Sequence, residues 1–219
     1  MKFNPDNMLF PGIYRGKVLD NTDPDKLGKL KVEVLGVFTG IAKEYLPWAV
    51  PGLPVFCGAG SGYGWFGVPA VGSWVWCFFE DGDHQQPVYF AEAPDGVHGF
   101  PTEGESGYPD SRGWVTPAGH SFVFDDNGAI TLTHKDGSII DIAELLLTLT
   151  HKDGCVIEMS PLAITLSHPT GVGIVISAAG VAITYPGGGS AVFGVGSAVM
   201  GFGNTTITMD GTTVEIGTI

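Results

Sequence analysis

The sequence predicts an all-β protein in two parts, a small barrel of short strands followed by a stacked array of strand pairs. Alternation of apolar and polar residues recurs in short runs over the first 93 residues, and helical periodicity is absent there. A seven-residue phrase, Thr131–Gly137, returns letter for letter 17 residues later as Thr148–Gly154. A short fixed period is typical of a stack in which each repeat contacts mainly its neighbours.

The chain divides into four segments by composition and periodicity. We expect an N-terminal arm over residues 1–10, a barrel or collar over 11–93, a Pro- and Gly-rich linker or neck over 94–113, and a repeat region over 114–219 that narrows after 190. The narrowing is expected because Gly, Ala and Ser dominate the last repeats.

The barrel is predicted from five short strands separated by turn residues. Asn21–Asp25 and Asp81–Asp83 are clusters of turn formers. The expected strands lie in Gly12–Leu19, Lys29–Val34, Tyr45–Val50, Gly72–Glu80 and Pro87–Ala91. Five such strands suit a barrel of the OB kind, although periodicity alone does not separate it from an SH3-like barrel.

Each 17-residue repeat is predicted to hold two strands. The phrase decays in phase to Thr165–Gly171 and then to Ala182–Gly188. Ile142–Leu147 has helical propensity, but its equivalents one and two repeats later contain Pro161 and Gly180. We therefore expect a turn and strand there instead of a helix.

An apolar stripe runs along one face of the repeats through Leu132, Leu149, Leu166 and Ile183. On a lone chain this stripe would face water beside open strand edges. Three chains winding together would cover the stripe and pair the edges, so burial predicts a homotrimer.

Composition excludes several classes of function. The net charge of −13 disfavours nucleic acid, because phosphate binding needs clustered Lys and Arg. No apolar run approaches the length of a membrane-spanning helix, and the N-terminus lacks the apolar segment of a secretory signal. Cys57, Cys77 and Cys155 lack metal-type spacing, and we interpret them as reduced core residues.

No set of residues predicts catalysis or cofactor binding, so we expect no enzyme activity. Glu103 and Glu105 fall in the neck, where nothing would fix the separation that a glycosidase needs. Glu80, Asp81 and Asp83 suit a solvated turn. Gly62–Gly67 fits Gly-x-Gly-x-x-Gly but no helix follows it. Trp65 and Phe66 in that loop are interpreted as barrel core or as a contact to another subunit.

His134, His151 and His168 form a ladder with the parity of the leucine stripe. We favour polar residues that are hydrogen-bonded at a turn, because Lys-Asp-Gly follows the first two directly. The alternative is an axial ladder in which rings of imidazoles hold a structural ion on the trimer axis. No other metal site is predicted.

Several motifs, in order, resemble the central spike of contractile phage baseplates and the valine-glycine-repeat spike protein of type VI secretion. Gly119-His120, Asp125-Asp126 and Gly128 resemble the motif that precedes the β-helix repeats of these spikes. The barrel motifs that resemble theirs are Tyr14–Val18, Asp23-Pro24, Leu27-Gly28, Gly72–Trp76, Phe79–Asp83 and Pro87–Tyr89.

The resemblance implies a homotrimer with an N-terminal OB-fold collar and a C-terminal intertwined triple-stranded β-helix, a trimeric prism. It implies a baseplate hub protein as partner at the collar and transient contact with the host outer membrane. The neck is far too short for the lysozyme domain that some spikes carry. Residues 190–219 hold no His-x-His iron site, so the apex is expected to be metal-free or capped by a separate tip protein.

The resulting functional hypothesis is a structural cell-puncturing spike of a contractile phage tail or a related tail particle. It would sit in the virion at the tail baseplate after assembly in the host cytoplasm, and would pierce the host outer membrane during genome delivery. The alternative hypothesis is a trimeric collar-and-stalk module that binds surface glycans, which would require an exposed groove lined by aromatic side chains.

Overall fold

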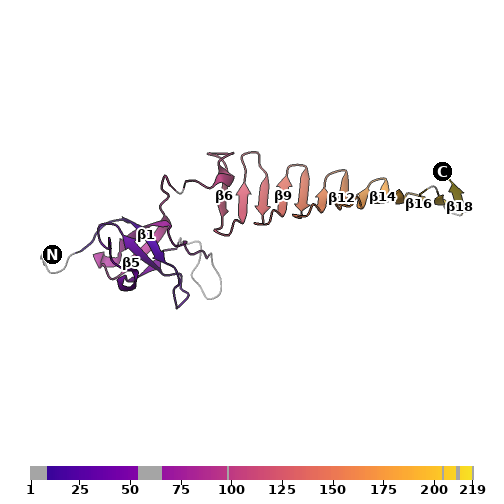
Figure 1. Ribbon diagram of the computed structural model, residues 1–219. Coiled ribbons are helices and arrows are strands. Elements are labelled where there is room, and N and C mark those ends of the chain that lie inside the picture. The colour runs from indigo at the N-terminus through magenta and orange to yellow at the C-terminus, as the bar shows by residue number, and fades with distance from the viewer. Residues whose placement is uncertain (1–8, 54–65, 98, 204, 211–212, 219) are drawn as a thin grey trace. The chain divides into compact units, whose positions relative to one another are not determined.

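The computed structural model describes residues 9–53, 66–97, 99–203, 205–210 and 213–218, and these residues are almost entirely strands and turns (Figure 1). The predicted all-β class is therefore confirmed. The chain divides into two compact units, Met1–Phe100 and Pro101–Ile219. The helical segments among the described residues are short 3-10 turns, η1 at Lys43–Tyr45, η3 at Glu80–Gly82 and η4 at Thr102–Gly104. No described helix is long and apolar enough to cross a bilayer.

The first unit is a closed five-stranded barrel whose strands match the five predicted segments. Its strands are β1 (Tyr14–Asp20), β2 (Leu30–Val34), β3 (Trp48–Pro51), β4 (Trp74–Phe79) and β5 (Pro87–Glu92). They follow the order β1-β2-β3-β5-β4, and β4 closes the barrel against β1. The β3–β5 pair is parallel and the other pairs are antiparallel. The five strands thus form an OB-like barrel, which is one of the two barrel types that the strand pattern allowed.

The barrel closes around the apolar side chains of alternating strand positions. Leu30, Val32 and Val34 of β2 are all buried, while the residues between them are not. Phe79 closes one part of the core against the rings of Phe10, Tyr14 and Phe38, with centroids 5.5–5.8 Å apart. In β2, the alternation of apolar and polar residues alone thus identifies the core residues correctly.

Two polar groups are built into this core. Cys77 has no solvent exposure, and burial raises the pKa of its thiol to about 12. Burial likewise raises the pKa of Tyr89 to about 12, while the Tyr89 hydroxyl donates a 2.6 Å hydrogen bond to the Gly28 carbonyl. Cys77 is therefore a free core cysteine, as predicted, whereas Cys155 is free but only partly buried, which corrects its assignment to a core. Cys57 lies outside the described residues.

The second unit is one antiparallel sheet of 13 strands in sequence order from β6 to β18. Its strands are β6 (Arg112–Val115), β7 (Ser121–Phe124), β8 (Ile130–Thr133), β9 (Ile139–Ala143), β10 (Leu146–Thr150), β11 (Val156–Met159), β12 (Ala163–Ser167), β13 (Gly173–Ser177), β14 (Gly180–Tyr185), β15 (Gly189–Gly194), β16 (Ser197–Phe202), β17 (Thr205–Asp210) and β18 (Thr213–Thr218). Each repeat contributes two strands, and β9 ends before β10 begins without an intervening helix, both as predicted.

The repeated glycines make the turns that join these strands. Gly137, Gly154 and Gly171 have φ of +97°, +88° and +90°, which a residue with a side chain adopts only with strain. In each of these turns the glycine N–H donates to the carbonyl of the repeat histidine, at 2.8–2.9 Å. The glycine at the end of each repeated motif is therefore retained because each repeat makes the same turn.

The pairing pattern corrects one sequence-based expectation. Strands β7 to β17 each pair with two neighbours of their own chain, so the open strand edges predicted beside the apolar stripe do not occur there. The chain supplies its own pairing by folding back and forth. The intertwined triple-stranded β-helix is not confirmed and stays a prediction.

Candidate assembly face

One face of the sheet is a continuous row of aliphatic side chains. Cross-strand pairing aligns Leu132 with Ile140, Ile140 with Leu149, and so on through Ile157, Leu166, Ile174 and Ile183. Because successive residues of a strand point to opposite faces, residues two positions along each strand share this side. These flanking residues are Ile130, Ile142, Leu147, Met159, Ile164, Ile176 and Val181, and the whole set is called the apolar face.

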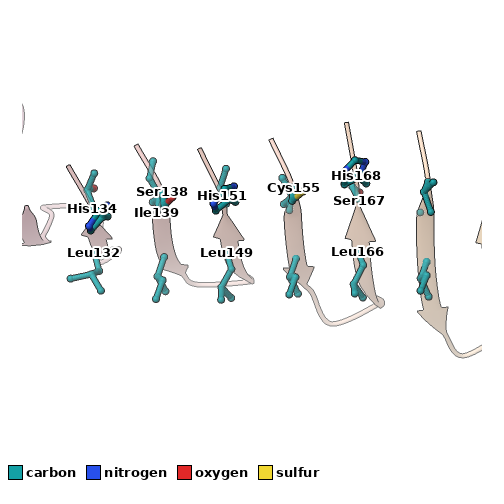
Figure 2. A pocket seen from close by; sticks show the side chains of 18 of the residues that line it. Leu132, His134, Ser138, Ile139, Leu149, His151, Cys155, Leu166, Ser167 and His168 are labelled. Carbon is teal, nitrogen blue, oxygen red and sulfur yellow. The ribbon is translucent and has the colours of Figure 1, made fainter. Parts of the chain in front are cut away.

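The apolar face is hollowed into an open groove of about 640 Å³. Figure 2 shows Leu132, Leu149 and Leu166 in one row on alternate strands, with His134, His151 and His168 in a second row beyond them. Side chains of the intervening strands, among them Ser138 and Cys155, complete the lining. Leu132 is 47% exposed and Ile176 is 43% exposed, values far above those of core residues of this size.

The opposite face of the same strands is polar in the first repeats. Thr131 pairs with Asp141, Asp141 with Thr148, and Thr148 with Glu158. The Thr131 hydroxyl donates a 2.9 Å hydrogen bond to Asp141 Oδ1. This side, with Thr131, Asp141, Thr148, Glu158 and Thr165, is called the polar face. In a sheet with one apolar and one polar face, the polar face can contact water, whereas the apolar face is normally covered by another protein layer.

The histidines lie at the border of the groove and take part in the turns that follow them. Nδ1 of His134 lies 2.8 Å from Asp136 Oδ1, and Nδ1 of His151 lies 3.5 Å from Asp153 Oδ2. In the third repeat Nδ1 of His168 lies 2.7 Å from the Thr170 hydroxyl. Each imidazole therefore has a local partner two residues along, which accounts for the ladder as a set of turn residues.

Asp136 shows the electrostatic effect of that arrangement. The hydrogen bond donated by the Ser138 N–H, and next the contact with the His134 ring, hold the pKa of Asp136 well below its usual value. The ring of His134 in turn packs against that of His120 in a tilted arrangement, with ring centroids 4.5 Å apart. The first turn thus joins a carboxylate and two imidazoles at the edge of the groove.

These groups do not assemble into a metal site within one chain. Among the residues that the structure describes, no three His, Cys, Asp or Glu side chains cluster closely enough to hold a metal ion. The structural ion on a trimer axis would need ligands from several copies and stays a prediction.

The acidic residues weighed as catalytic candidates are dispersed. Glu80 and Asp81 lie in η3, and the Asp83 carboxylate accepts a hydrogen bond from the Gln85 N–H at 2.9 Å, as in a turn. Glu103 lies in η4 in the other unit. Of the Gly-x-Gly-x-x-Gly loop, residues 62–65 with Trp65 lie outside the described residues, and Phe66 is 99% exposed.

The sequence analysis missed an aromatic patch on the outside of the barrel. Trp76, Phe78 and Phe90 are 37–39% exposed, and the rings of Phe78 and Phe90 are 5.9 Å apart. In β4 both faces are apolar, so alternation does not distinguish outward from inward positions. This set is called the aromatic patch.

The barrel is the part of the chain that matches a known protein family. Residues 14–92 match the family model of the Type VI secretion system/phage-baseplate injector OB domain, and these bounds coincide with the start of β1 and the end of β5. The match covers the barrel alone and does not extend into the repeat region. The resemblance drawn from the barrel motifs is therefore confirmed, and it supports a general role in a phage baseplate or related injector.

Solved structures give only remote likenesses. Two similar solved structures are a mutant TCP10 domain of Danio rerio CPAP and the wild-type domain in complex with a peptide of Danio rerio STIL. Each is 17% identical in sequence, and each match covers 51% of this chain. They cover 70% and 66% of those chains, with TM-scores of 0.39 and 0.41. A Drosophila melanogaster SAS-4 TCP domain in complex with a proline-rich motif of Ana2 is 14% identical, covers 58% of this chain and 96% of that chain, and has a TM-score of 0.23.

These likenesses carry no argument about function, because every TM-score is below 0.5. No curated protein matches the chain.

Proposed function

We propose that the protein is the subunit of a homotrimeric, cell-puncturing spike of a contractile phage tail or a related tail particle. The injector OB domain forms the collar, and the long sheet forms the needle. Three copies pack their apolar faces together around a common axis, and the polar faces point outward. The spike acts mechanically, without a catalytic site, and pierces the outer membrane of the host.

The observation that carries this proposal is the exposed apolar face on a chain that begins with an injector OB domain. A soluble protein rarely leaves a patch of this extent open to water. Leu132, Ile142 and Ile176 are 47%, 45% and 43% exposed in one chain, and their burial would contribute about 25 cal/mol for each Å² of apolar surface removed from water. A second layer of the same chain is not available to cover them, since the described strands of this unit form one sheet.

Two surfaces are proposed as contacts for other proteins. The aromatic patch of the barrel offers an apolar surface for a hub protein of the baseplate or for neighbouring collars. Among the described strands β18 pairs with β17 alone, so its other edge carries backbone groups that a separate tip protein could pair. Both partners, and a location at the tail baseplate of a virion, belong to the proposal.

A matched pair of substitutions on β13 tests the role of the apolar face. Ile174 pairs with Leu166 and Ile183 on the apolar face, whereas its neighbour Val175 pairs with Thr165 and Ala182 on the other side. We expect Ile174→Glu to abolish the trimer, because a carboxylate would be buried among aliphatic side chains. Val175→Glu should leave the trimer intact, because Asp141 and Glu158 occupy equivalent outward positions.

The measurement is native mass by light scattering, together with electrophoresis in SDS without boiling. The wild-type protein should have a mass near 69 kDa, three times the 23.0 kDa of one chain, and should resist SDS. A wild-type monomer, or an Ile174→Glu variant that keeps the wild-type mass, would refute the assembly. Clearing of a cell-wall suspension by the protein would refute the claim that it has no catalytic role.

A further inference from the structure

Formal charge disappears from the sheet at residue 159 and returns at Asp210. No Asp, Glu, Lys or Arg occurs in residues 159–209, and only Asp210 and Glu215 occur from there to residue 219. Residues 101–158 of the same unit carry three basic and ten acidic side chains. The segment without formal charge is called the uncharged band.

The loss of charge follows the repeat position by position while the fold is kept. Asp141 and Glu158 hold the central position of the polar face, and the equivalent positions one and two repeats later are Val175 and Val192. These two valines occupy the same place in the pairing, each between two neighbouring strands, and are 37% and 43% exposed. A central row that is acidic in the first repeats is therefore apolar in the band.

The turns lose their charges in the same way. Lys135-Asp136 and Lys152-Asp153 become Pro169-Thr170 and then Pro186-Gly187. The Asp136 carboxylate binds the His134 ring in the first turn, and the uncharged Thr170 hydroxyl binds the His168 ring in the third. The turn geometry does not need the charge, because Gly137 and Gly171 keep nearly the same φ.

The length of the uncharged band is close to the thickness of the hydrocarbon core of a bilayer. Glu158 lies in β11 and Asp210 in β17, and the strands between them follow one another in sequence order (Figure 1). Six strand spacings of about 4.8 Å separate the strands of these two acidic residues by roughly 29 Å. The hydrocarbon core of a bilayer is about 30 Å thick, and a charged side chain inside it is costly.

We propose that the uncharged band is the part of the needle that lodges in the hydrocarbon core of the membrane, with its outward face against lipid acyl chains. The partner is thus the apolar interior of a bilayer, and anionic headgroups are not needed for the contact. Glu158 and Asp210 mark the two ends of the band, where water and headgroups begin. This inference rests on the proposed function, since it takes the trimer with outward-facing Val175 and Val192 as given.

The test compares a charge with an uncharged group of the same shape at the same two positions. The double variant V175E/V192E restores the acidic pattern of Asp141 and Glu158, and V175Q/V192Q is its matched control. Each full-length protein is mixed with phosphatidylcholine in octyl glucoside, and the detergent is dialysed away so that no mechanical force is needed for insertion. Flotation in a density gradient then gives the ratio of vesicle-bound to free protein, and light scattering gives the mass of each protein beforehand.

We expect the wild-type trimer to float with the vesicles and V175Q/V192Q to float within about threefold of it. V175E/V192E should remain a trimer and show a bound-to-free ratio at least tenfold lower, because six carboxylates per trimer would enter hydrocarbon. A wild-type trimer that stays with the free fraction, or a Glu variant that floats like the Gln variant, overturns the inference while leaving the spike intact. A wild-type protein that is not trimeric counts against the proposed function itself.

Discussion

Gly154 occupies a turn where a side chain would meet two separate obstacles. Its φ of +88° lies in the left-handed region, and a Cβ atom would lie 3.1 Å from Cγ of Pro169 in the next repeat. Gly137 has a similar φ of +97°, but nothing lies within 4 Å of its Cβ position. Substitutions at the two glycines therefore distinguish two effects on the free energy of unfolding. Both positions carry backbone strain, and Gly154 alone adds a steric contact with the next turn.

We expect Gly137→Ala to lower the free energy of unfolding by about 1–2 kcal/mol through backbone strain alone. Gly154→Ala should cost about 1 kcal/mol more, because the new methyl group also displaces Pro169. Urea unfolding at a fixed protein concentration measures both. Equal losses for the two variants would mean that the turns do not pack on one another.

At the same scale, the histidine ladder shows how far single residues can be predicted. The Lys-Asp-Gly that follows His134 and His151 indicated turn residues, and the short contacts from each Nδ1 to the residue two positions along agree with that interpretation. The tilted ring contact between His134 and His120 could not be predicted, because His120 belongs to a different turn outside the repeated phrase.

Among the elements of the barrel, the loop between β1 and β2 depends on one carboxylate. Asp23 accepts hydrogen bonds from the N–H groups of Leu27, Asp25 and Lys29, at 2.7, 3.1 and 3.2 Å. Desolvation opposes ionisation of Asp23, but these three hydrogen bonds outweigh it and lower its pKa below the model-compound value of 3.8. Its contribution to stability is therefore present above about pH 4 and is lost as the pH falls through the lowered folded-state pKa.

We expect Asp23→Asn to lower the melting temperature of the barrel at pH 7, and the difference from wild type to shrink as the pH approaches 3. Asp25→Asn is the control, because Asp25 makes only an exposed contact to Lys29 at 2.9 Å. Its effect at pH 7 should be smaller. Calorimetry at pH 7, 5 and 3 gives the comparison, and a pH-independent effect of Asp23→Asn would contradict the proposed role of its charge.

The positions of the strands were largely predictable from the sequence, whereas the partners with which they pair or pack were not. Alternation in Leu30–Val34 identified β2 and its buried residues, since inward positions in a small barrel must be apolar. The 17-residue period identified strand pairs but fits pairing within one chain and between chains equally well. The aromatic patch could not be predicted because β4 is apolar on both faces. Without alternation between polar and apolar residues, the sequence does not show which side chains of a strand point outward.

For the whole molecule, a cysteine on the apolar face reports on assembly. Cys155 lines the groove and is partly exposed in one chain, so it would be covered in the proposed trimer. Cys77 is fully buried within the barrel, and its raised pKa keeps the thiol protonated at ordinary pH. Cys77 therefore serves as an internal standard that assembly does not affect.

We expect iodoacetamide at pH 8 to alkylate Cys155 slowly in wild-type protein and at least tenfold faster in Ile174→Glu, while Cys77 remains unmodified in both. Mass spectrometry of the separated peptides assigns each cysteine. Equal rates at Cys155 in a trimeric wild type and a monomeric variant would place this residue outside the contact between copies.

The sequential pairing of β6 to β18 also bears on how the proposed trimer would assemble. From β7 onward each strand pairs with the one before it in the sequence, so each contact closes a loop of only a few residues and the contact order of the sheet is low. A nascent chain can therefore complete its sheet strand by strand before it meets another copy. We expect the rate of association to rise with protein concentration, because each copy can bring strands that are already paired within its own chain.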